Sequence, residues 1–462
     1  MLKRVVSLSG VSLMEKSKGQ WSSKLGFVLA SAGAAIGLGA IWKMPYVAGQ
    51  SGGGAFFLIF VVLTLVIGLP MLLSEYIIGR AAQKEAVTAY KILAPNTKAW
   101  AWIGKLGIIG CFLLLSFYSV VGGWIIVYSG VSVVGNVIDP AVDPGVFFGQ
   151  VTGTPKIALM GLALFTLANV IVIALGVQNG IEKANKFMMP LLFIMFFILV
   201  VRAVTLDGAM EGIKFFLYPD FSNITGESIL YALGQSFFAL AVGFSCLVTY
   251  SSYLKKDVSL PNSAGSVVGL SIFVSFLAGL AIFPVVFAFD MEVTSGPPLL
   301  FMVLPAAFSQ MPFGELFLAM FLVLFLFATL TSSFSLYEII VAAVVEKWNI
   351  SRAKITVVIG LLVFIAAIPS TLTYSTLGDV SIFGRNIFDF TDFVVSNVIL
   401  PIGNLLIAIF IIHIMDKQVV KKELLQGSKM GEGFYKVYRF LMTFIVPTVI
   451  VIVLVYLVLQ YK

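Results

Sequence analysis

The chain has 462 residues, of which 60% are hydrophobic and 11% are charged, and its formal net charge is +7. Soluble domains have about a quarter of their residues charged, so this composition excludes a soluble globular protein. The positive charge does not indicate nucleic-acid binding, because the basic residues lie in short segments between long apolar runs.

These apolar runs recur along the whole chain. A helix of about 20 apolar residues crosses a hydrocarbon core roughly 30 Å thick. We therefore predict an all-α polytopic membrane protein with about 11 transmembrane helices, on the length argument above. The predicted spans are 26–48, 53–79, 103–131, 156–176, 186–205, 226–250, 263–289, 312–344, 353–370, 387–413 and 437–459.

The distribution of basic residues predicts the orientation. They are concentrated before the first predicted span, after the second and after the tenth, whereas the segments around Asp143 and Asp290 carry almost none. The positive-inside rule then predicts a cytoplasmic N-terminus and, with an odd number of spans, an extracellular C-terminus. We expect a multi-pass protein of the cell (inner) membrane. Residues 290–308 are interrupted by proline and are predicted to form an outer re-entrant loop.

The span order also predicts internal symmetry. Five spans followed by five that begin on the opposite face form an inverted repeat. The predicted organisation is a cytoplasmic tail at 1–25, a first five-helix repeat at 26–205, an extracellular loop at 206–225, a second five-helix repeat at 226–413, a cytoplasmic loop at 414–436, and an eleventh helix with a short extracellular tail at 437–462.

Glycine clusters lie at corresponding positions of the two halves. The first span contains GAAIGLGAIWKMP (33–45) and the sixth contains GQSFFALAVGFS (234–245). One interpretation is close helix packing, because Gly33 and Gly37 have small-xxx-small spacing. The other is that both helices unwind, since transporters built from inverted repeats place broken helices at equivalent positions with the site between them. The freed carbonyls would then coordinate a cation, because unpaired backbone at membrane depth is tolerated where it lines a cavity.

Three longer stretches resemble one known family. They are WSSKLGFVLASAGAAIGLGAIWKMPYVAGQSGGGAF, GQSFFALAVGFSCLVTYSSYLKKD and FATLTSSFSLYEIIVA, and the family is the neurotransmitter:sodium symporters, typified by the bacterial leucine transporter. The resemblance extends from Trp21 over nearly all of the remaining chain. It implies the leucine-transporter-like fold, an inverted 5+5 repeat with helices 1 and 6 unwound. It also implies sodium-coupled symport of amino acids by alternating access.

The resemblance implies a sodium site next to the first break. Ala328, Thr331 and Ser332 are spaced i, i+3 and i+4 and share one helix face. As a bare pattern this signal is weak, because serine and threonine in membrane helices commonly bond their own backbone. The family places a sodium ion between this face and the first unwound helix. The implied ligands are the carbonyls of Gly33, Ile36 and Ala328 and the hydroxyls of Thr331 and Ser332.

At the family's second sodium site this chain departs from the pattern. Ala40 and Ala239 replace residues with side-chain oxygens, and the ligand of the seventh span aligns best with Ser271. A buried cation without oxygen ligands is costly, so we expect one sodium ion per cycle. The positions that match the family's chloride site contain no acidic residue, and we expect no chloride dependence. These positions are Phe60, Gln235, Ala239, Ser271 and Ser275.

The residues that match the family's substrate pocket come from the first, third, sixth and eighth spans. They are Ala34, Ala35, Gly37, Leu38, Gly39, Leu114, Tyr118, Phe238, Ala239, Ala241, Phe244, Ser332 and Leu336. The amides at 37–39 and the Tyr118 hydroxyl could bind a carboxylate. The apolar walls favour a hydrophobic or small neutral amino acid. Because the second cation is missing, a small amine or an N-modified amino acid is the alternative.

The resemblance also implies gates. Lys43 and Asp392 match the extracellular ion-pair gate, where lysine lacks the bidentate fork of the family's usual arginine. The segment GIEKANKFMMP, with Gly180 and Pro190, resembles the part of the fifth helix that unwinds. Glu75 is expected to hold broken backbone together rather than to carry a proton. The residues that match the intracellular gate are Lys18, Trp21, Tyr253 and Glu346.

A sodium-coupled amino-acid transporter is therefore the first functional hypothesis. A sodium-independent exchanger or a ligand sensor of the same fold is the second. An enzyme is not expected, because the sequence contains no metal-ligand cluster, phosphate loop or nucleophile–base constellation. The expected partners are a small-molecule substrate and the lipid bilayer, with no nucleic acid, and the chain is expected to be a monomer or weak dimer.

Overall fold

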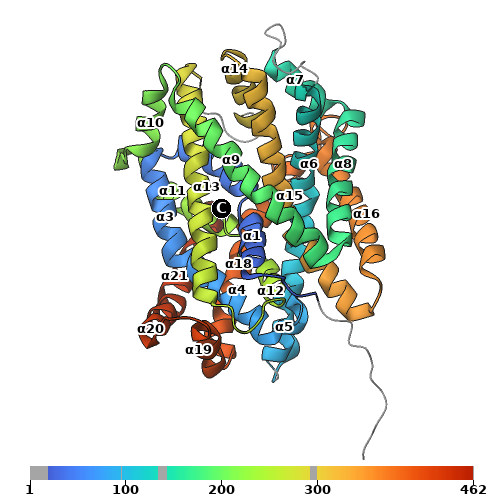
Figure 1. Cartoon of the computed structure of the whole chain (residues 1–462), viewed down its shortest axis with the longest axis vertical. Helices are drawn as coiled ribbons and strands as arrows, with labels where there is room; N and C mark the ends of the chain where they lie inside the picture. Colours follow the sequence, from blue (N-terminus) through green and yellow to red (C-terminus); the bar gives the residue numbers. More distant parts are fainter. Residues whose placement is uncertain (1–18, 95, 134–142, 292–298, 461–462) are drawn as a thin grey trace, which may run out of the picture.

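The computed structural model describes residues 19–94, 96–133, 143–291 and 299–460. These residues form a helical bundle, and within it the one β-type pairing is an isolated bridge between Ile382 and Arg385. Figure 1 shows short helices at both ends of the bundle. One end, here the α19 end, carries α5 (Ala86–Leu93), α19 (Lys417–Leu425) and α20 (Glu432–Phe440). The other, the α10 end, carries α7 (Pro144–Gly153), α10 (Ala209–Leu217) and α14 (Leu304–Ser309).

Nine of the described helices are long and apolar enough to cross a membrane. They are Gly54–Ala82, Lys98–Ser132, Pro155–Ala174, Val177–Val204, Leu260–Ala288, Gly314–Trp348, Arg352–Tyr374, Ile387–Ile414 and Glu432–Leu457. These spans include the helices α3 (Gly54–Leu63), α4 (Leu69–Ala82), α6 (Ala101–Val133), α8 (Pro155–Ala174), η4 (Val177–Glu182), α9 (Lys183–Val204), α13 (Leu260–Ala288), α15 (Gly314–Trp348), α16 (Arg352–Thr371), α18 (Leu400–Ile409) and α21 (Val446–Gln460).

The first predicted span is broken, as the glycine cluster predicts. Helix α1 (Lys24–Ala35) ends where Ile36 leaves helical geometry, with φ −88° and ψ 82°. The chain resumes as a π-helix, η1 (Gly39–Lys43), and as α2 (Met44–Gln50). The two halves are bent by 51° and together form one broken span.

The sixth predicted span is also broken. Helix α11 (Gly226–Phe238) and helix α12 (Cys246–Ser251) are separated by seven non-helical residues, 239–245. Ala241, Gly243 and Ser245 there have φ values of 52°, 102° and 59°. Positive φ is incompatible with a right-handed helix, so the helix ends in this stretch. The prediction that helices 1 and 6 are unwound is confirmed.

The all-helical fold class is confirmed, but the count of eleven spans is not. The described residues give nine continuous spans and one bent pair, and the predicted span 226–250 consists of two helices too short to cross separately. The fifth predicted span begins at residue 177 instead of 186, and the eleventh at 432 instead of 437. Residues 292–298 of the predicted re-entrant loop lie outside the described residues, and the rest of that segment forms α14 and the π-helix Leu299–Val303 before it.

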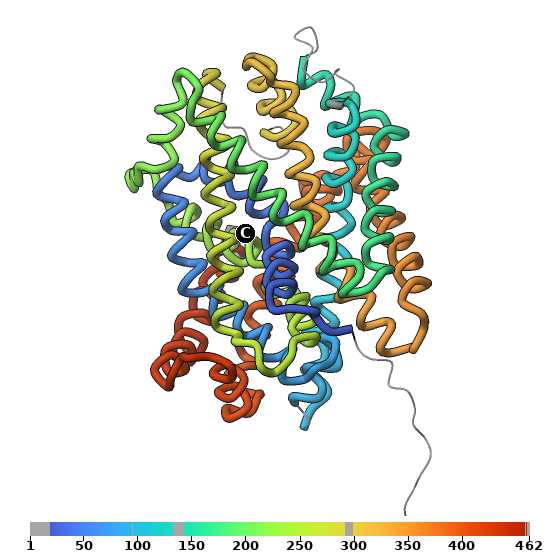
Figure 2. The backbone as a smooth tube through the Cα atoms, viewed as in Figure 1, coloured from blue at the N-terminus to red at the C-terminus, as the bar shows by residue number. Residues whose placement is uncertain are grey.

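The two broken helices lie inside the bundle. Helix α1 packs against α9, α13 and α15, and Figures 1 and 2 show it, in dark blue, enclosed by these longer helices. Helix α12 packs against α4 and α15, and α11 packs against α3. The break of each helix is therefore surrounded by protein, which is the setting in which unpaired backbone is tolerated at membrane depth.

Candidate ion and substrate site

The break after α1 frees two main-chain carbonyls. The Gly37 N–H donates to Ala35 O (3.2 Å) instead of to Gly33 O, and the Leu38 N–H faces the Tyr118 hydroxyl at 3.5 Å instead of Ala34 O. The Ser332 hydroxyl of α15 lies 2.9 Å from both Gly33 O and Ala34 O. A serine carries one hydroxyl hydrogen, so at least one of the two carbonyls stays available to another partner.

Four of the five predicted sodium-ligand residues, Gly33, Ala328, Thr331 and Ser332, are neighbours at this point. Gly33, Ala328 and Thr331 are buried, and a β-carbon on Gly33 would lie 3.0 Å from Thr331 Cβ. The Thr331 hydroxyl donates to Ala328 O (3.0 Å), which leaves its oxygen free to accept or coordinate. Among the hydrogen bonds of the described residues, none goes from a main-chain N–H to the Ile36 carbonyl. Carbonyl and hydroxyl oxygens of this kind suit a hard cation.

The region around Ala40 and Ala239, which matches the family's second sodium site, contains hydrogen bonds between protein groups and apolar side chains. The Gln235 side-chain amide donates to Gly39 O (2.6 Å), and the Ser271 hydroxyl donates to Ala239 O (2.8 Å). Ala239 itself packs with Phe60 in an apolar cluster. Protein hydrogen-bond donors thus occupy the carbonyls that the two breaks expose in this corner.

A small cavity lies between the two breaks. Twelve of the thirteen predicted substrate-pocket residues line it, and the exception is Ala239. The lining residues are Ala34, Ala35, Gly37, Leu38, Gly39, Leu114, Tyr118, Phe238, Ala241, Phe244, Ser332 and Leu336. The walls are mainly apolar, and the polar groups at the cavity are main-chain groups of 34–39 and the hydroxyls of Tyr118 and Ser332. An apolar cavity with a few convergent polar groups is typical of a small-molecule site.

The glycines of the first break allow close contact across the cavity. A β-carbon on Gly37 would lie 2.2 Å from Ser332 Oγ and 2.7 Å from Tyr118 Oη. A β-carbon on Gly39 would lie 2.6 Å from the Phe238 ring. A larger residue at either position would displace Ser332, Tyr118 or Phe238. Glycine is therefore needed here, because the backbone approaches these side chains closely.

The second break is held by a buried carboxylate. Glu75 of α4 accepts hydrogen bonds from the main-chain N–H groups of Gly243 (2.7 Å) and Leu247 (3.2 Å). Asn404 of α18 donates to Val242 O (3.3 Å) on the same stretch. Glu75 therefore pairs with backbone donors that the break exposes, which confirms the expectation that it holds broken backbone together.

The predicted extracellular gate is a closed ion pair. Lys43 Nζ lies 2.6 Å from Asp392 Oδ1 and 3.2 Å from Ser396 Oγ, and it also lies 4.5 Å from the centre of the Phe238 ring. Phe238 lines the cavity. The ion pair therefore sits directly above the cavity and joins the outer half of the first helix to the segment Ile387–Phe393 (α17).

We expect Asp392→Asn to weaken substrate binding about fivefold, because a partly exposed ion pair contributes up to about 1 kcal/mol. Equilibrium binding of labelled substrate at saturating sodium measures this. Ser396→Ala is the comparison variant, since it removes the hydroxyl that contacts both Lys43 (3.2 Å) and Asp392 (2.7 Å) and keeps both charges. Equal affinities of Asp392→Asn and the unmodified chain would contradict a role in closure.

At the α19 end, two of the four predicted intracellular-gate residues meet. The Trp21 indole N–H donates to Tyr250 O (2.8 Å), and its ring packs edge-on against Tyr253. Glu346 pairs with Lys84 (3.1 Å). Lys18 lies outside the described residues.

Two charged residues of this region, Lys84 and Arg352, were not predicted from the sequence. Tyr253 donates to Glu338 (2.7 Å), which pairs with Arg352. Arg352 follows α15 at the start of α16, and nothing in its sequence context distinguishes it from other loop cations.

The predicted helix-5 element is wound in this structure. Gly180 lies in the π-helix η4, and Pro190 lies inside α9. A β-carbon on Gly180 would lie 1.9 Å from Val172 O of α8, so glycine is required there for packing. Unwinding of this segment during transport stays a prediction.

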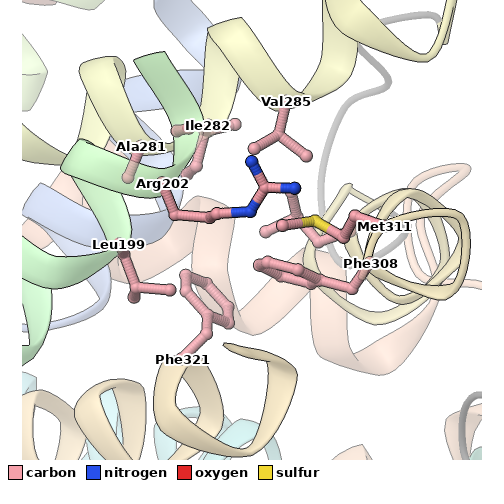
Figure 3. Close-up of a pocket in the computed structure, with 10 residues that line it drawn as sticks. Leu199, Arg202, Ala281, Ile282, Val285, Phe308, Met311 and Phe321 are labelled. Atoms are coloured by element: carbon pink, nitrogen blue, oxygen red, sulfur yellow. The ribbon is translucent and has the colours of Figure 1, made fainter. Parts of the chain in front are cut away.

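A second small cavity lies among α9, α13, α14 and α15 (Figure 3). Nine of its ten lining residues are apolar, and the guanidinium of Arg202 points into it between Val285 and Met311. None of the predicted site residues lines this cavity, and it touches neither break. The cavity between the breaks is therefore the candidate substrate site.

Comparison with known proteins places this geometry in context. The chain matches the sodium:neurotransmitter symporter family over residues 18–138 and 150–462. It is 50% identical to an uncharacterized sodium-dependent transporter of Bacillus subtilis (strain 168), YhdH, over 96% of this chain and 98% of that protein. It is 38% identical to an uncharacterized sodium-dependent transporter of Haemophilus influenzae, over 95% and 98% of the two chains. The crystal structure of MhsT in complex with L-phenylalanine superposes with a TM-score of 0.89, at 39% identity, over 95% of this chain and 99% of that one.

Proposed function

Because the chain belongs to the sodium:neurotransmitter symporter family and is a sodium-dependent membrane transporter, we propose that it couples one sodium ion to the uptake of an amino acid. The amino acid is hydrophobic or small and neutral, and transport proceeds by alternating access between an outward-open and an inward-open conformation. The mechanism needs no covalent chemistry, because binding energy alone shifts the balance between the two conformations.

One observation carries this proposal. The Ser332 hydroxyl contacts the carbonyls of Gly33 and Ala34 where α1 breaks, and the neighbouring Thr331 packs against Gly33. The same Ser332 and the same break border the cavity. An ion at this point would hold α1 against α15 and would also order the main-chain groups that the substrate contacts. Ion binding and substrate binding would then stabilise the same conformation, which is the thermodynamic requirement for coupling.

The chemistry of the cavity supports an amino-acid substrate. The N–H groups of the first break and the Tyr118 hydroxyl would donate to a carboxylate after giving up their present contacts, which are Gly37 N–H to Ala35 O and Leu38 N–H to Tyr118. The carbonyls of Ala35 and Phe238 each accept one main-chain N–H and have a second lone pair for an ammonium group. The other walls, including Leu114, Phe244 and Leu336, are apolar. MhsT, a relative of known structure, binds L-phenylalanine.

The proposal of a single sodium ion rests on the corner around Ala239. There the Gln235 amide and the Ser271 hydroxyl donate to the carbonyls that a second cation would use. A cation in that corner would have to displace two buried hydrogen bonds and lie against Phe60 and Ala239, which is unfavourable. A second candidate substrate class is a small amine or an N-modified amino acid. It is supported by the same lack of a second cation, because no ion at that place would balance the carboxylate of an amino acid.

We expect the sodium dependence of substrate binding to have a Hill coefficient near one. A single ion per cycle gives a hyperbolic dependence, whereas two coupled ions give a sigmoidal one. The measurement is a titration of labelled-substrate binding with sodium gluconate at constant ionic strength, repeated with sodium chloride. A Hill coefficient close to two would contradict the single-ion proposal, and a requirement for chloride would contradict the absence of a chloride site.

A panel of labelled solutes tests the substrate class. Purified protein in liposomes is given an inward sodium gradient and is offered hydrophobic, small neutral, acidic and basic amino acids, N-methylated amino acids and simple amines. We expect accumulation of the hydrophobic or small neutral amino acids. Accumulation of amines alone would replace the amino-acid proposal by the amine alternative, and binding without accumulation would favour a ligand sensor.

We also propose that the α19 end faces the cytoplasm of a cell whose inner membrane holds the protein. The basic residues of the segment 414–436 and of the N-terminal region support this orientation through the positive-inside rule. Under this orientation the Lys43–Asp392 pair is the extracellular gate, and Trp21 with Tyr253 belongs to the cytoplasmic gate.

A further inference from the structure

Asn185 is a buried amide with half of its hydrogen-bonding capacity unused. It lies in the first turn of α9 and is fully buried. Its Nδ2 donates to Ile181 O (2.9 Å) in the preceding π-helix η4. Its Oδ1 has no hydrogen-bond partner among the described residues. The Nδ2 contact fixes the orientation of the amide, because a flipped side chain would place Oδ1 against another carbonyl oxygen.

The unpaired oxygen lies beside Gly33, one of the residues of the predicted sodium site. A β-carbon on Gly33 would lie 2.1 Å from Asn185 Oδ1 and 3.0 Å from Thr331 Cβ. Asn185 on α9 and Thr331 on α15 therefore contact the same point of α1. This point is Gly33, whose carbonyl is one of the predicted sodium ligands.

Neither Gly33 nor Thr331 offers Asn185 Oδ1 a donor. Gly33 presents its α-carbon on this side, and the Thr331 hydroxyl already donates to Ala328 O. The predicted ligands at this place are all oxygens, and a further buried oxygen without a donor adds to their negative potential. A buried unpaired acceptor is unfavourable, and a cation or a hydrogen-bond donor at this place would relieve it.

We propose that Asn185 Oδ1 supplies a further oxygen to the sodium ion held between α1 and α15, so that the ion joins three helices. This inference rests on the proposed function, because it needs an ion at that position. It also links the ion to η4. The Asn185 amide is held by Ile181 O, so unwinding of η4 would release the amide and turn its oxygen away from Gly33. The ion would then lose a ligand when this segment opens.

The test measures sodium binding without transport. The purified full-length chain is titrated with sodium at constant ionic strength, with potassium as the balancing ion and without substrate, and the rise in unfolding temperature gives the sodium midpoint. Asn185→Leu removes the oxygen at similar volume and is expected to raise this midpoint about tenfold. Asn185→Asp keeps an oxygen and is expected to keep or lower the midpoint.

A matched control is available in α18. Asn404 is also fully buried, also donates through Nδ2 to the carbonyl four residues earlier (Leu400 O, 3.0 Å), and also has an unpaired Oδ1 among the described residues. It differs from Asn185 in a second Nδ2 contact, with Val242 O (3.3 Å) of the second break. Its oxygen does not face Gly33. Asn404→Leu is expected to leave the sodium midpoint unchanged within twofold, whatever it does to the unfolding temperature without sodium.

The outcomes separate this inference from the proposed function. An unchanged midpoint in Asn185→Leu, together with a lost sodium response in Thr331→Val, overturns the role of Asn185 and leaves the ion site standing. An equal shift in Asn185→Leu and Asn404→Leu also overturns it. A sodium response that survives in both Asn185→Leu and Thr331→Val overturns the ion site itself. If Asn185→Leu does not fold, Asn185→Ala takes its place with the same expectation.

Discussion

Replacing Thr331 by valine is expected to raise the sodium concentration for half-maximal substrate binding ten- to a hundredfold. Valine has nearly the same shape as threonine but lacks the hydroxyl, and Thr331 is fully buried against α1. An interaction between a hydroxyl and a charged partner contributes about 1.5–3 kcal/mol, which corresponds to this range of affinity. Labelled-substrate binding, titrated with sodium, measures the effect.

The neighbouring Thr329 provides the control for this substitution. It is also fully buried on α15, and its hydroxyl donates to Phe325 O (2.7 Å) of its own helix. Thr329→Val removes a buried hydroxyl of the same kind without touching the predicted site. We expect its sodium dependence to equal that of the unmodified chain. If Thr331→Val and Thr329→Val behave alike, the hydroxyl of Thr331 is not a sodium ligand.

The second large effect is expected from Gly37→Ala, which should weaken substrate binding ten- to a hundredfold at saturating sodium. The added β-carbon would lie 2.2 Å from Ser332 Oγ and 2.7 Å from Tyr118 Oη, and both side chains line the cavity. Overpacking of this kind costs about 1–3 kcal/mol. The displaced groups are those that order the first break, so the cost falls on the binding site. Equilibrium binding of labelled substrate gives the magnitude.

Gly234→Ala is the matched control for Gly37→Ala. Gly234 lies in α11, on the other broken helix, and a β-carbon there meets no atom within 4 Å. Alanine is also the better helix former. We expect this variant to bind substrate as the unmodified chain does. Full binding by Gly37→Ala would show that the cavity tolerates the extra group and that the substrate binds elsewhere.

The positions of both helix breaks could be predicted from the sequence because glycine clusters weaken a helix wherever they occur. Gly37 and Gly39 mark the first break, and Gly243, with φ 102°, lies in the second. The family motifs then indicated which side chains face the cavity. Ala239 is the exception, because it follows α11 directly and turns into the apolar cluster with Phe60.

Other features depended on contacts between distant segments. The start of the fifth span was predicted too late because the residues there are polar. Glu182 shows why they can be part of the span: it is buried and accepts hydrogen bonds from the Ser22 N–H (2.8 Å) and from Lys186 (2.7 Å). The sequence indicated that side-chain ligands for a second sodium ion are missing near Ala239. It did not indicate that the Gln235 side-chain amide donates a hydrogen bond to Gly39 O. In the sequence, nothing distinguishes Asn185 from the other polar residues at the start of the fifth span, and only the structure shows its contact with Gly33.

The central claim is that a sodium gradient drives uptake through this chain. The most direct measurement compares accumulation of a labelled hydrophobic amino acid by proteoliposomes under an inward sodium gradient and under an equal inward potassium gradient, at the same membrane potential. We predict accumulation above the equilibrium level with sodium, and simple equilibration or none with potassium. Equal accumulation under the two gradients would contradict the account.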